Sequence, residues 1–197
     1  MYKRQGNLLG PQQHGQMAAV GFDMYCQMLS QAINELKGEE PAISELPPVD
    51  LPVNAHIPVD YIPTENLRLA FYKKMTAVRD EKDIEQLAEE LHDRFGELPR
   101  PVVNSLDILR LRLKCAAVGI SSISTDRRQV IIRFAVGIRL APDVSRDLKK
   151  KYPEHVFLPD RVILHSATPR LVRMLGYILD DLPAALEESK EIYLARI

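Results

Sequence analysis

Apolar residues recur at intervals of three or four along much of this chain, the spacing that one buried face of an α-helix requires. Several of these runs end at a glycine or shortly before a proline, residues that often stop a helix. Gly38 and Gly96 occupy such positions, and Pro99 supports the second stop. The pattern therefore predicts a series of helices. The predicted helices span residues 17–37, 64–78, 82–95, 101–118 and 142–152, with a last one after Thr168.

Two threonines have the position of a helix N-cap, where a side-chain oxygen can accept a hydrogen bond from a free backbone N–H. Thr64 precedes the second predicted helix, and Thr168 precedes the last one. Pro169 follows Thr168 at the first helical position, where proline is favoured. Pro183 lies well inside the last helical pattern and is expected to break or kink it before residues 187–194.

The apolar period changes from about 3.6 to 2 after residue 118, which indicates strands in place of helices. Two predicted strands flank Asp126-Arg127 and form a hairpin, and two more flank Pro159-Asp160. Helices come first and hairpins later, so the pattern predicts an α+β fold and not a doubly wound parallel sheet. The predicted strands span residues 53–57, 120–124, 129–135, 156–158 and 162–164.

Prolines and acidic residues gather between residues 38 and 52, which indicates an extended connector because proline fixes φ and removes an amide donor. The predicted organisation is therefore a helical N-terminal appendage over residues 1–37, a linker over 38–52 and a compact domain over 53–197. The compact domain is expected to hold about five helices with short antiparallel strands.

Charge balance argues against autonomous nucleic-acid binding. The 197 residues include 26 Lys and Arg against 27 Asp and Glu, a formal net charge of −1. Proteins that bind nucleic acids strongly usually carry a basic excess, because neutralising phosphates supplies much of the affinity. No apolar run approaches the roughly 20 residues of a membrane helix, and no signal peptide is recognisable. We therefore expect a cytoplasmic protein with no membrane partner.

The sequence lacks the residue patterns of common catalytic and metal sites. No glycine-rich loop of the nucleotide-binding types is present. Cys26 and Cys115 are far apart and are expected to be free buried thiols, and the five histidines lack metal-ligand spacing. Ser166 follows His165 but lacks the glycine-flanked turn that exposes a nucleophile. The chain is therefore predicted not to be a free-standing enzyme, and no cofactor or metal site is expected in it.

A loop near the N-terminus that is rich in glycine and amide residues is the first candidate functional segment. Glycine allows another chain or a phosphate to approach the backbone closely, and amide side chains offer donors. On physical grounds alone, an ordinary loop that enters a helix is an equally good interpretation. The candidate residues in this loop are Gly6, Leu8, Leu9, Gly10, Gln13 and Gly15.

An acidic helix face between residues 89 and 99 is the second candidate. Glu90 and Asp93 are three residues apart, and at about 100° per residue both are expected opposite the apolar side that includes Leu91 and Phe95. Carboxylates accept two parallel hydrogen bonds from an arginine, so this face could dock on arginines of a partner. Spacing alone favours the simpler interpretation, a solvated acidic face.

These segments also carry a family resemblance. The loop from Gly6 to Gly15 resembles the end of the translocation motif shared by the transcription-repair coupling factor (Mfd) family and the RecG-type helicases. The following segments resemble the C-terminal domain of the coupling factor alone. They are Tyr61-Ile62-Pro63, Arg68 to Lys73, Glu90 to Gly96, and Pro99. Residues 1–5 depart from the sequence expected before this loop and resemble a foreign or truncated start.

The resemblance implies a fragment of a large ATP-driven translocase of double-stranded DNA. Proteins of this family displace stalled RNA polymerase and recruit the excision-repair protein UvrA. ATP and Mg would be bound by motor lobes that precede Gly6, so no cofactor is expected in the fragment itself. The family's C-terminal domain is a regulatory clamp that covers the UvrA-binding surface of a UvrB-like module in the same protein.

The resemblance also implies roles for individual residues. Glu90 and Asp93 match acidic positions that meet arginines of the UvrB-like module, and Gln13 matches a glutamine that couples ATP hydrolysis to movement. The leading hypothesis is therefore a non-catalytic module for interaction and autoinhibition.

Two alternatives stay open at this point. In one, the segment from Gly6 to Lys37 acts as a motor-coupling fragment of a RecG-like helicase, and the rest is passive. In the other, the chain is an auxiliary nucleic-acid-binding domain, which the charge balance disfavours. The basic residues that the second alternative would use are Arg110, Arg112 and Lys114, or Lys149 to Lys151.

Overall fold

The structure is a computed structural model that describes residues 46–127, 129–165 and 171–194, with residues 183–194 described by their backbone alone. The described part has five helices and one antiparallel sheet of four strands, so the α+β class predicted from the sequence is confirmed. The predicted helical appendage over residues 1–37 lies outside the described residues. The elements in chain order are α2 (Glu65–Ala77), α3 (Glu81–Phe95), α4 (Arg100–Val118), β1 (Ile120–Asp126), β2 (Gln129–Phe134), α5 (Pro142–Lys151), β3 (Val156–Phe157), β4 (Arg161–His165) and α6 (Leu171–Leu194).

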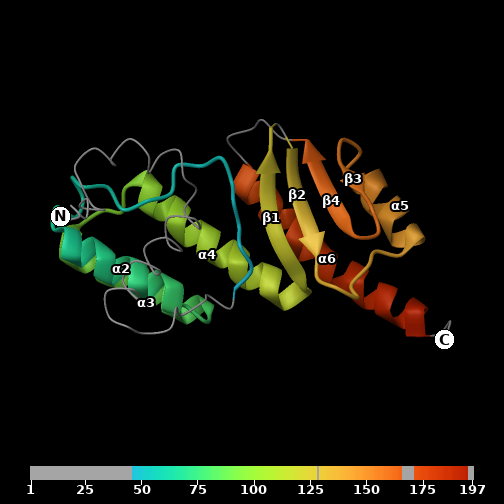
Figure 1. Cartoon of the computed structure of the whole chain (residues 1–197), viewed down its shortest axis with the longest axis horizontal. Helices are drawn as coiled ribbons and strands as arrows, with labels where there is room; N and C mark the ends of the chain where they lie inside the picture. Colours follow the sequence, from blue (N-terminus) through green and yellow to red (C-terminus); the bar gives the residue numbers. More distant parts are fainter. Residues whose placement is uncertain (1–45, 128, 166–170, 195–197) are drawn as a thin grey trace, which may run out of the picture.

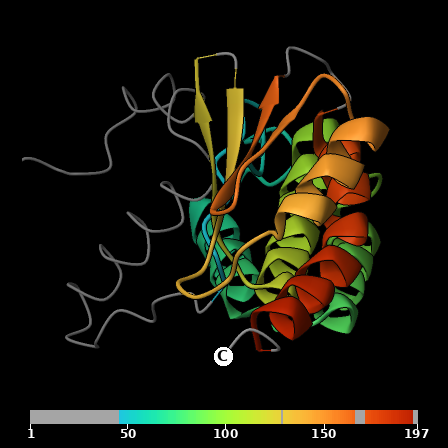
Figure 2. The ribbon, with the colours of Figure 1, turned by 90° about the vertical axis from the view of Figure 1, so that its right-hand side faces the viewer.

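The described residues form two halves that share the long helix α4 (Figure 1). In one half, α2 and α3 pack beside α4. In the other, the sheet has the strand order β1-β2-β4-β3, and α4, α5 and α6 lie on one side of it (Figure 2). Helix α4 contacts α3, β1 and α6 directly, so it joins the helical half to the sheet.

The β1–β2 hairpin follows from alternation of apolar and polar residues. Val130 and Ile132 of β2 are buried toward the helices, whereas Ile131 between them is only partly buried. Ile123 of β1 faces Ile132 across the ladder. Arg127 has a φ of 55°. The predicted turn at this point is therefore confirmed and uses a residue in the left-handed region.

Helix α3 has well-defined ends. The side chain of Asp80 accepts a hydrogen bond from the backbone N–H of Asp83, and the Asp83 side chain accepts one from the Asp80 N–H, a reciprocal capping box. Gly96 ends the helix with a φ of 84°. Glycine adopts this left-handed conformation without steric cost, and its position in the sequence predicted the stop. Thr64 occupies the predicted N-cap position of α2. Its side chain makes no capping hydrogen bond, so the predicted capping interaction is wrong.

The predicted strand at residues 53–57 is not formed. The Val53 N–H donates to Leu51 O at 2.7 Å, a tight local turn. The Ile57 N–H donates to the hydroxyl oxygen of Tyr72 on α2 at 2.8 Å. The alternating pattern is present, but prolines on both sides and these two hydrogen bonds satisfy the backbone without a partner strand.

Helix α6 continues through Pro183, so the helix does not break there, and a kink at this residue stays a prediction. A proline inside a helix removes one backbone hydrogen bond and can cost about 3 kcal/mol. The preceding turns offset that cost by packing, because Leu175, Ile178 and Leu182 are fully buried. The predicted caps of this helix, Thr168 and Pro169, lie outside the described residues.

An edge segment, residues 46–51, runs beside β1 and extends the sheet (Figure 1). Val49 pairs with Ile123 of β1 in a parallel bridge. The Ile123 N–H donates to Pro48 O, and the Asp50 N–H donates to Ile123 O, both at 2.9 Å. The end of the predicted linker is therefore extended but bound to the domain. The division of the chain at residue 52 stays a prediction.

The edge segment is also held by a buried arginine of α4. Arg112 is only 4% exposed, and its guanidinium donates to the carbonyl oxygens of Leu46 and Pro47, each at 3.0 Å. Val49 and Leu51 are buried in the same core. Two segments that are far apart in the sequence thus form one contact. A buried charge is tolerated here because backbone carbonyls solvate it.

Another buried residue of α4, Cys115, is a free thiol whose burial raises its pKa to about 12. This part of the cysteine prediction is confirmed. Cys26 lies outside the described residues.

We predict that Arg112→Met lowers the free energy of unfolding by about 1–3 kcal/mol, because two partly buried carbonyl groups lose their donor. Urea denaturation followed by circular dichroism measures this change. Arg110→Met, two residues earlier on the same helix, is the matched control. It removes only half-exposed ion pairs and should cost at most about 1 kcal/mol. Equal effects of the two changes would contradict the role assigned to Arg112.

Candidate docking surface on helix α3

Helix α3 packs one face against α2 and α4 and leaves the opposite face open. Ile84, Leu87 and Leu91 form the buried stripe. With 3.6 residues per turn, Asp93 lies about 150° and Glu90 about 90° from the centre of that stripe. The two carboxylates therefore do not share one environment. Asp93 is on the open face, and Glu90 is on the flank that faces α2.

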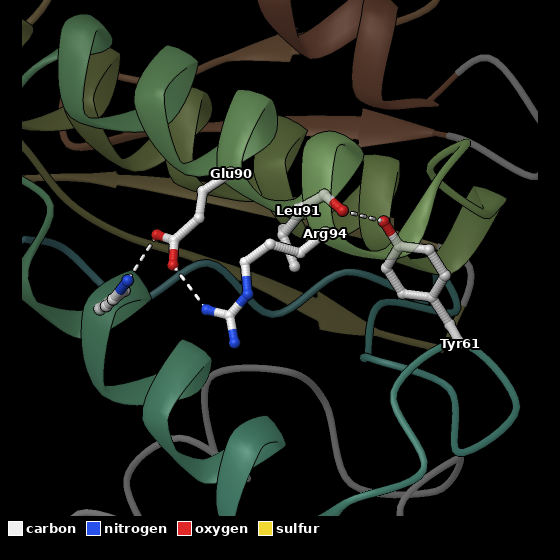
Figure 3. A network of polar contacts seen from close by, with 5 residues as sticks. Tyr61, Glu90, Leu91 and Arg94 are labelled. Carbon is white, nitrogen blue, oxygen red and sulfur yellow. Dashed lines mark hydrogen bonds and ion pairs between the residues drawn. The ribbon is translucent and has the colours of Figure 1, made fainter.

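Aromatic contacts fix the C-terminal end of α3. The rings of Tyr61 and Phe71 each meet the ring of Phe95 edge-on, with centroid distances of 5.8 Å and 5.7 Å. This is a favoured geometry for aromatic pairs. The Tyr61 hydroxyl donates toward Leu91 O at 2.9 Å (Figure 3) and also lies 3.1 Å from Gly96 O. Leu91 lies near the C-terminal end of α3, and Gly96 lies just beyond it, so Tyr61 anchors the helix end that carries the acidic residues.

Glu90 is bound on both of its carboxylate oxygens. Lys74 of α2 pairs with Oε2, and Arg94 of α3 donates to Oε1 at 2.9 Å (Figure 3). The Arg94 guanidinium also lies over the rings of Phe71 and Phe95, at 5.4 Å and 5.2 Å from their centroids. Both distances are within the range of cation–π attraction. The hydrogen bond from Lys74 is the main cause that lowers the pKa of Glu90. Glu90 therefore bridges α2 and α3.

Asp93 differs from Glu90 in its surroundings. Its side chain is exposed, and it makes no hydrogen bond or ion pair to another of the described residues. The prediction that Asp93 lies opposite the apolar side of the helix is correct. The same prediction for Glu90 needs correction, because its flank position brings it to the cations of the α2–α3 interface.

Sequence reasoning missed Lys74 and Arg94 as partners of Glu90. The Glu90–Arg94 pair could have been read from its spacing of four residues along a helix. The Lys74–Glu90 contact joins two helices across 16 residues of sequence, so no local pattern reports it.

The basic residues that a nucleic-acid-binding domain would use already bind carboxylates or carbonyl oxygens within the domain. On α4, Arg110 pairs with Glu81 of α3 at 2.7 Å, and Lys114 pairs with Asp180 of α6 at 2.6 Å. Arg112 is buried against the edge segment.

The three lysines at the end of α5 are engaged in the same way. Lys149 donates to the carbonyls of Pro153 and His155, Lys150 pairs with Asp147, and Lys151 pairs with Asp181. These contacts disfavour a free basic surface at either group of residues.

Other candidate chemistry is not assembled in the described part of the chain. Among residues 46–127, 129–165 and 171–194, no group of three His, Cys, Asp or Glu side chains is arranged to hold a metal ion. His165 lies near Gln129 and Glu154 O, and Ser166 is outside the described residues. The loop with Gly6, Gln13 and the other candidate residues is outside them too. No helix in the described ranges is long and apolar enough to cross a membrane.

We predict that carbon-detected NMR titration will place the pKa of Glu90 below its ordinary value of 4.5. Lys74→Met should raise this pKa, because the group that stabilises the charged carboxylate is removed. Lys73→Met is the matched control and should leave it unchanged, since Lys73 is exposed and has no described contact with Glu90.

The lowered pKa also fixes the sign of a stability effect. The contribution of Glu90 to stability is fully present above its ordinary pKa of 4.5 and is lost as the pH falls through the folded-state pKa. An exposed pair of this kind contributes at most about 1 kcal/mol. A Glu90 pKa at or above its ordinary value would contradict the bridge.

Comparison with known proteins identifies relatives of this chain. Residues 51–144 match the family model of the TRCF domain. The transcription-repair-coupling factor of Escherichia coli strain K12 is 37% identical over 155 residues, which cover 76% of this chain and 14% of that relative. The one from Mycobacterium tuberculosis strain CDC 1551 is 34% identical over 164 residues, covering 75% and 13%. The one from Staphylococcus aureus strain NCTC 8325 is 38% identical over 133 residues, covering 66% and 11%.

A solved structure supports the same assignment at the level of the fold. A crystal structure of the C-terminal domain of a transcription-repair coupling factor aligns with a TM-score of 0.55 and 21% sequence identity. The alignment covers 75% of this chain and 96% of that one. This chain spans only 11–14% of the length of the curated relatives named above. The chain therefore belongs to the transcription-repair coupling factor family and corresponds to its C-terminal domain.

Proposed function

We propose that this domain is a regulatory docking module that acts by binding and not by catalysis. In the parent protein it would cover the UvrA-binding surface of a UvrB-like module and release it when the motor engages DNA. The observation that carries this proposal is the exposed carboxylate of Asp93 on a well-anchored helix, one turn from Glu90. Arginines of the partner module fit that surface, because guanidinium groups bind carboxylates with defined geometry.

The parent protein would supply the remaining activities. We propose that it is a cytoplasmic ATP-dependent translocase of double-stranded DNA that displaces stalled RNA polymerase and recruits UvrA. ATP and Mg would be bound by its motor domains. The loop from Gly6 to Gly15 would form the end of the translocation motif, with Gln13 coupling ATP hydrolysis to movement. The family membership of the chain supports these assignments.

An independent nucleic-acid-binding role fits less well. The chain has no net basic charge, and the cations that such a role would use are paired within the domain. A gel shift that weakens steeply with salt would be the signature of phosphate contacts by the isolated chain.

We predict that Asp93→Asn weakens binding of the chain to the isolated UvrB-like module without lowering its melting temperature. The Asp93 side chain makes no hydrogen bond or ion pair within the described part of the domain, so the loss of its charge should affect only the docked state. Together with Glu90→Gln, the change should remove about 1–4 kcal/mol of docking free energy. Isothermal titration calorimetry of the module with each variant measures this loss.

Glu85→Gln is the matched control for net charge. Glu85 is exposed on the same helix, two turns before Asp93, so a specific docking contact should tolerate this change. In the full-length parent, the Asp93 and Glu90 changes should also strengthen UvrA binding, because the open population rises about 5- to several-hundred-fold. Unchanged affinities for both the module and UvrA in the double variant would show that the docking contact lies elsewhere.

A further inference from the structure

Both carboxylate oxygens of Glu90 are already engaged within the domain, which limits how a partner can bind this residue. A bidentate guanidinium needs both oxygens of the carboxylate that it binds. In the structure, Lys74 occupies Oε2 of Glu90, and Arg94 occupies Oε1. Each oxygen can still accept a second hydrogen bond, but an arginine of a partner that binds Glu90 in this way becomes the third cation on one carboxylate. Repulsion among three cations on a single negative charge favours the release of one of them.

The two cations are held to different degrees. Arg94 is on the same helix as Glu90, one turn away, and its planar guanidinium lies over both Phe71 and Phe95. Lys74 comes from α2, is half exposed, and lies over a single ring among the described residues, with its Nζ 5.1 Å from the Phe71 centroid. An ammonium group is a strongly hydrated point charge on a flexible stem, so water compensates its release well. Lys74 is the cation that can leave at the lower cost.

We propose that Lys74 is an intramolecular competitor for Glu90, so that docking exchanges Lys74 for a guanidinium of the partner on that carboxylate. This inference rests on the proposed docking function. Asp93 faces no such competition within the described residues and forms the first contact. The contact at Glu90 then adds to the docking free energy only the difference between the new ion pair with the partner and the lost ion pair with Lys74. Lys74 thereby keeps the docked state weak and easy to release.

The test compares two adjacent lysines of α2. Lys73→Met and Lys74→Met remove the same charge from exposed positions one residue apart. Of these two lysines, Lys74 has a described contact with Glu90 and Lys73 has none. The probe is the purified UvrB-like module, titrated calorimetrically into each variant of the full chain at low salt. We expect Lys74→Met to bind about two- to fivefold tighter than Lys73→Met, the range set by loss of one exposed ion pair.

A double-mutant cycle assigns the gain to Glu90. In a Glu90→Gln background, the difference between the two lysine variants should disappear, because the carboxylate for which Lys74 competes is absent. Lys74→Gln is a second variant, and melting temperatures of all variants confirm that each is folded.

The outcomes separate this inference from the proposed function. If Asp93→Asn weakens binding but Lys74→Met binds no tighter than Lys73→Met, docking stands and the competitor role is overturned. If Lys74→Met binds more weakly, Lys74 itself contacts the partner, which also overturns it. If neither Asp93→Asn nor Glu90→Gln changes the affinity for the UvrB-like module, the proposed docking surface is wrong, and so is the proposed exchange at Glu90.

Discussion

Burial of helix α4 on several sides is the constraint on which the rest of this domain depends. The helix contacts α3 in one half of the structure and β1 and α6 in the other, so neither half has a complete core without it. Arg110 and Lys114 add ion pairs to α3 and α6. Between them, Arg112 is buried and binds the edge segment through two carbonyls. The orientation of α3 relative to the sheet therefore follows from packing on α4.

This scaffold explains why the residues that carry the family resemblance are mostly structural. Tyr61, Phe71 and Phe95 form one aromatic cluster, and the Tyr61 hydroxyl bonds to carbonyls at the end of α3. Glu90 adds an ion-pair bridge at the edge of the same cluster. The motif thus encodes a helix held at one end, and Asp93 is the acidic residue that this arrangement leaves available for a partner. The motif therefore contains both the residues that hold the helix and the two acidic residues of the proposed docking contact.

Elements that depend on a local pattern of apolar residues were predicted correctly from the sequence. Predictions failed where contacts between distant segments determine the structure. Helix α3 and the β1–β2 hairpin follow from apolar spacing, a capping residue and a turn, all within a few residues. The strand expected at residues 53–57 has the right alternation, but Tyr72 of α2 takes the Ile57 amide, which alternation cannot report. The contact of Arg112 with Leu46 and Pro47 spans 65 or more residues. Such contacts arise from packing, so no local pattern contains them.

The same distinction governs the candidate docking surface. A spacing of three residues predicted the same surroundings for Glu90 and Asp93, but Glu90 pairs with Lys74 of α2 and Arg94 of α3, whereas Asp93 is exposed. A contact that must open on demand cannot be too strong, because a trigger shifts an equilibrium only by its own differential affinity for the two states. Asp93 is exposed and can attract a partner cation with its full charge. Glu90 is already paired with cations of the domain, and these pairs reduce the attraction that it adds. In the proposed clamp, a trigger whose own preference for the open state is only a few kcal/mol would therefore be sufficient for opening.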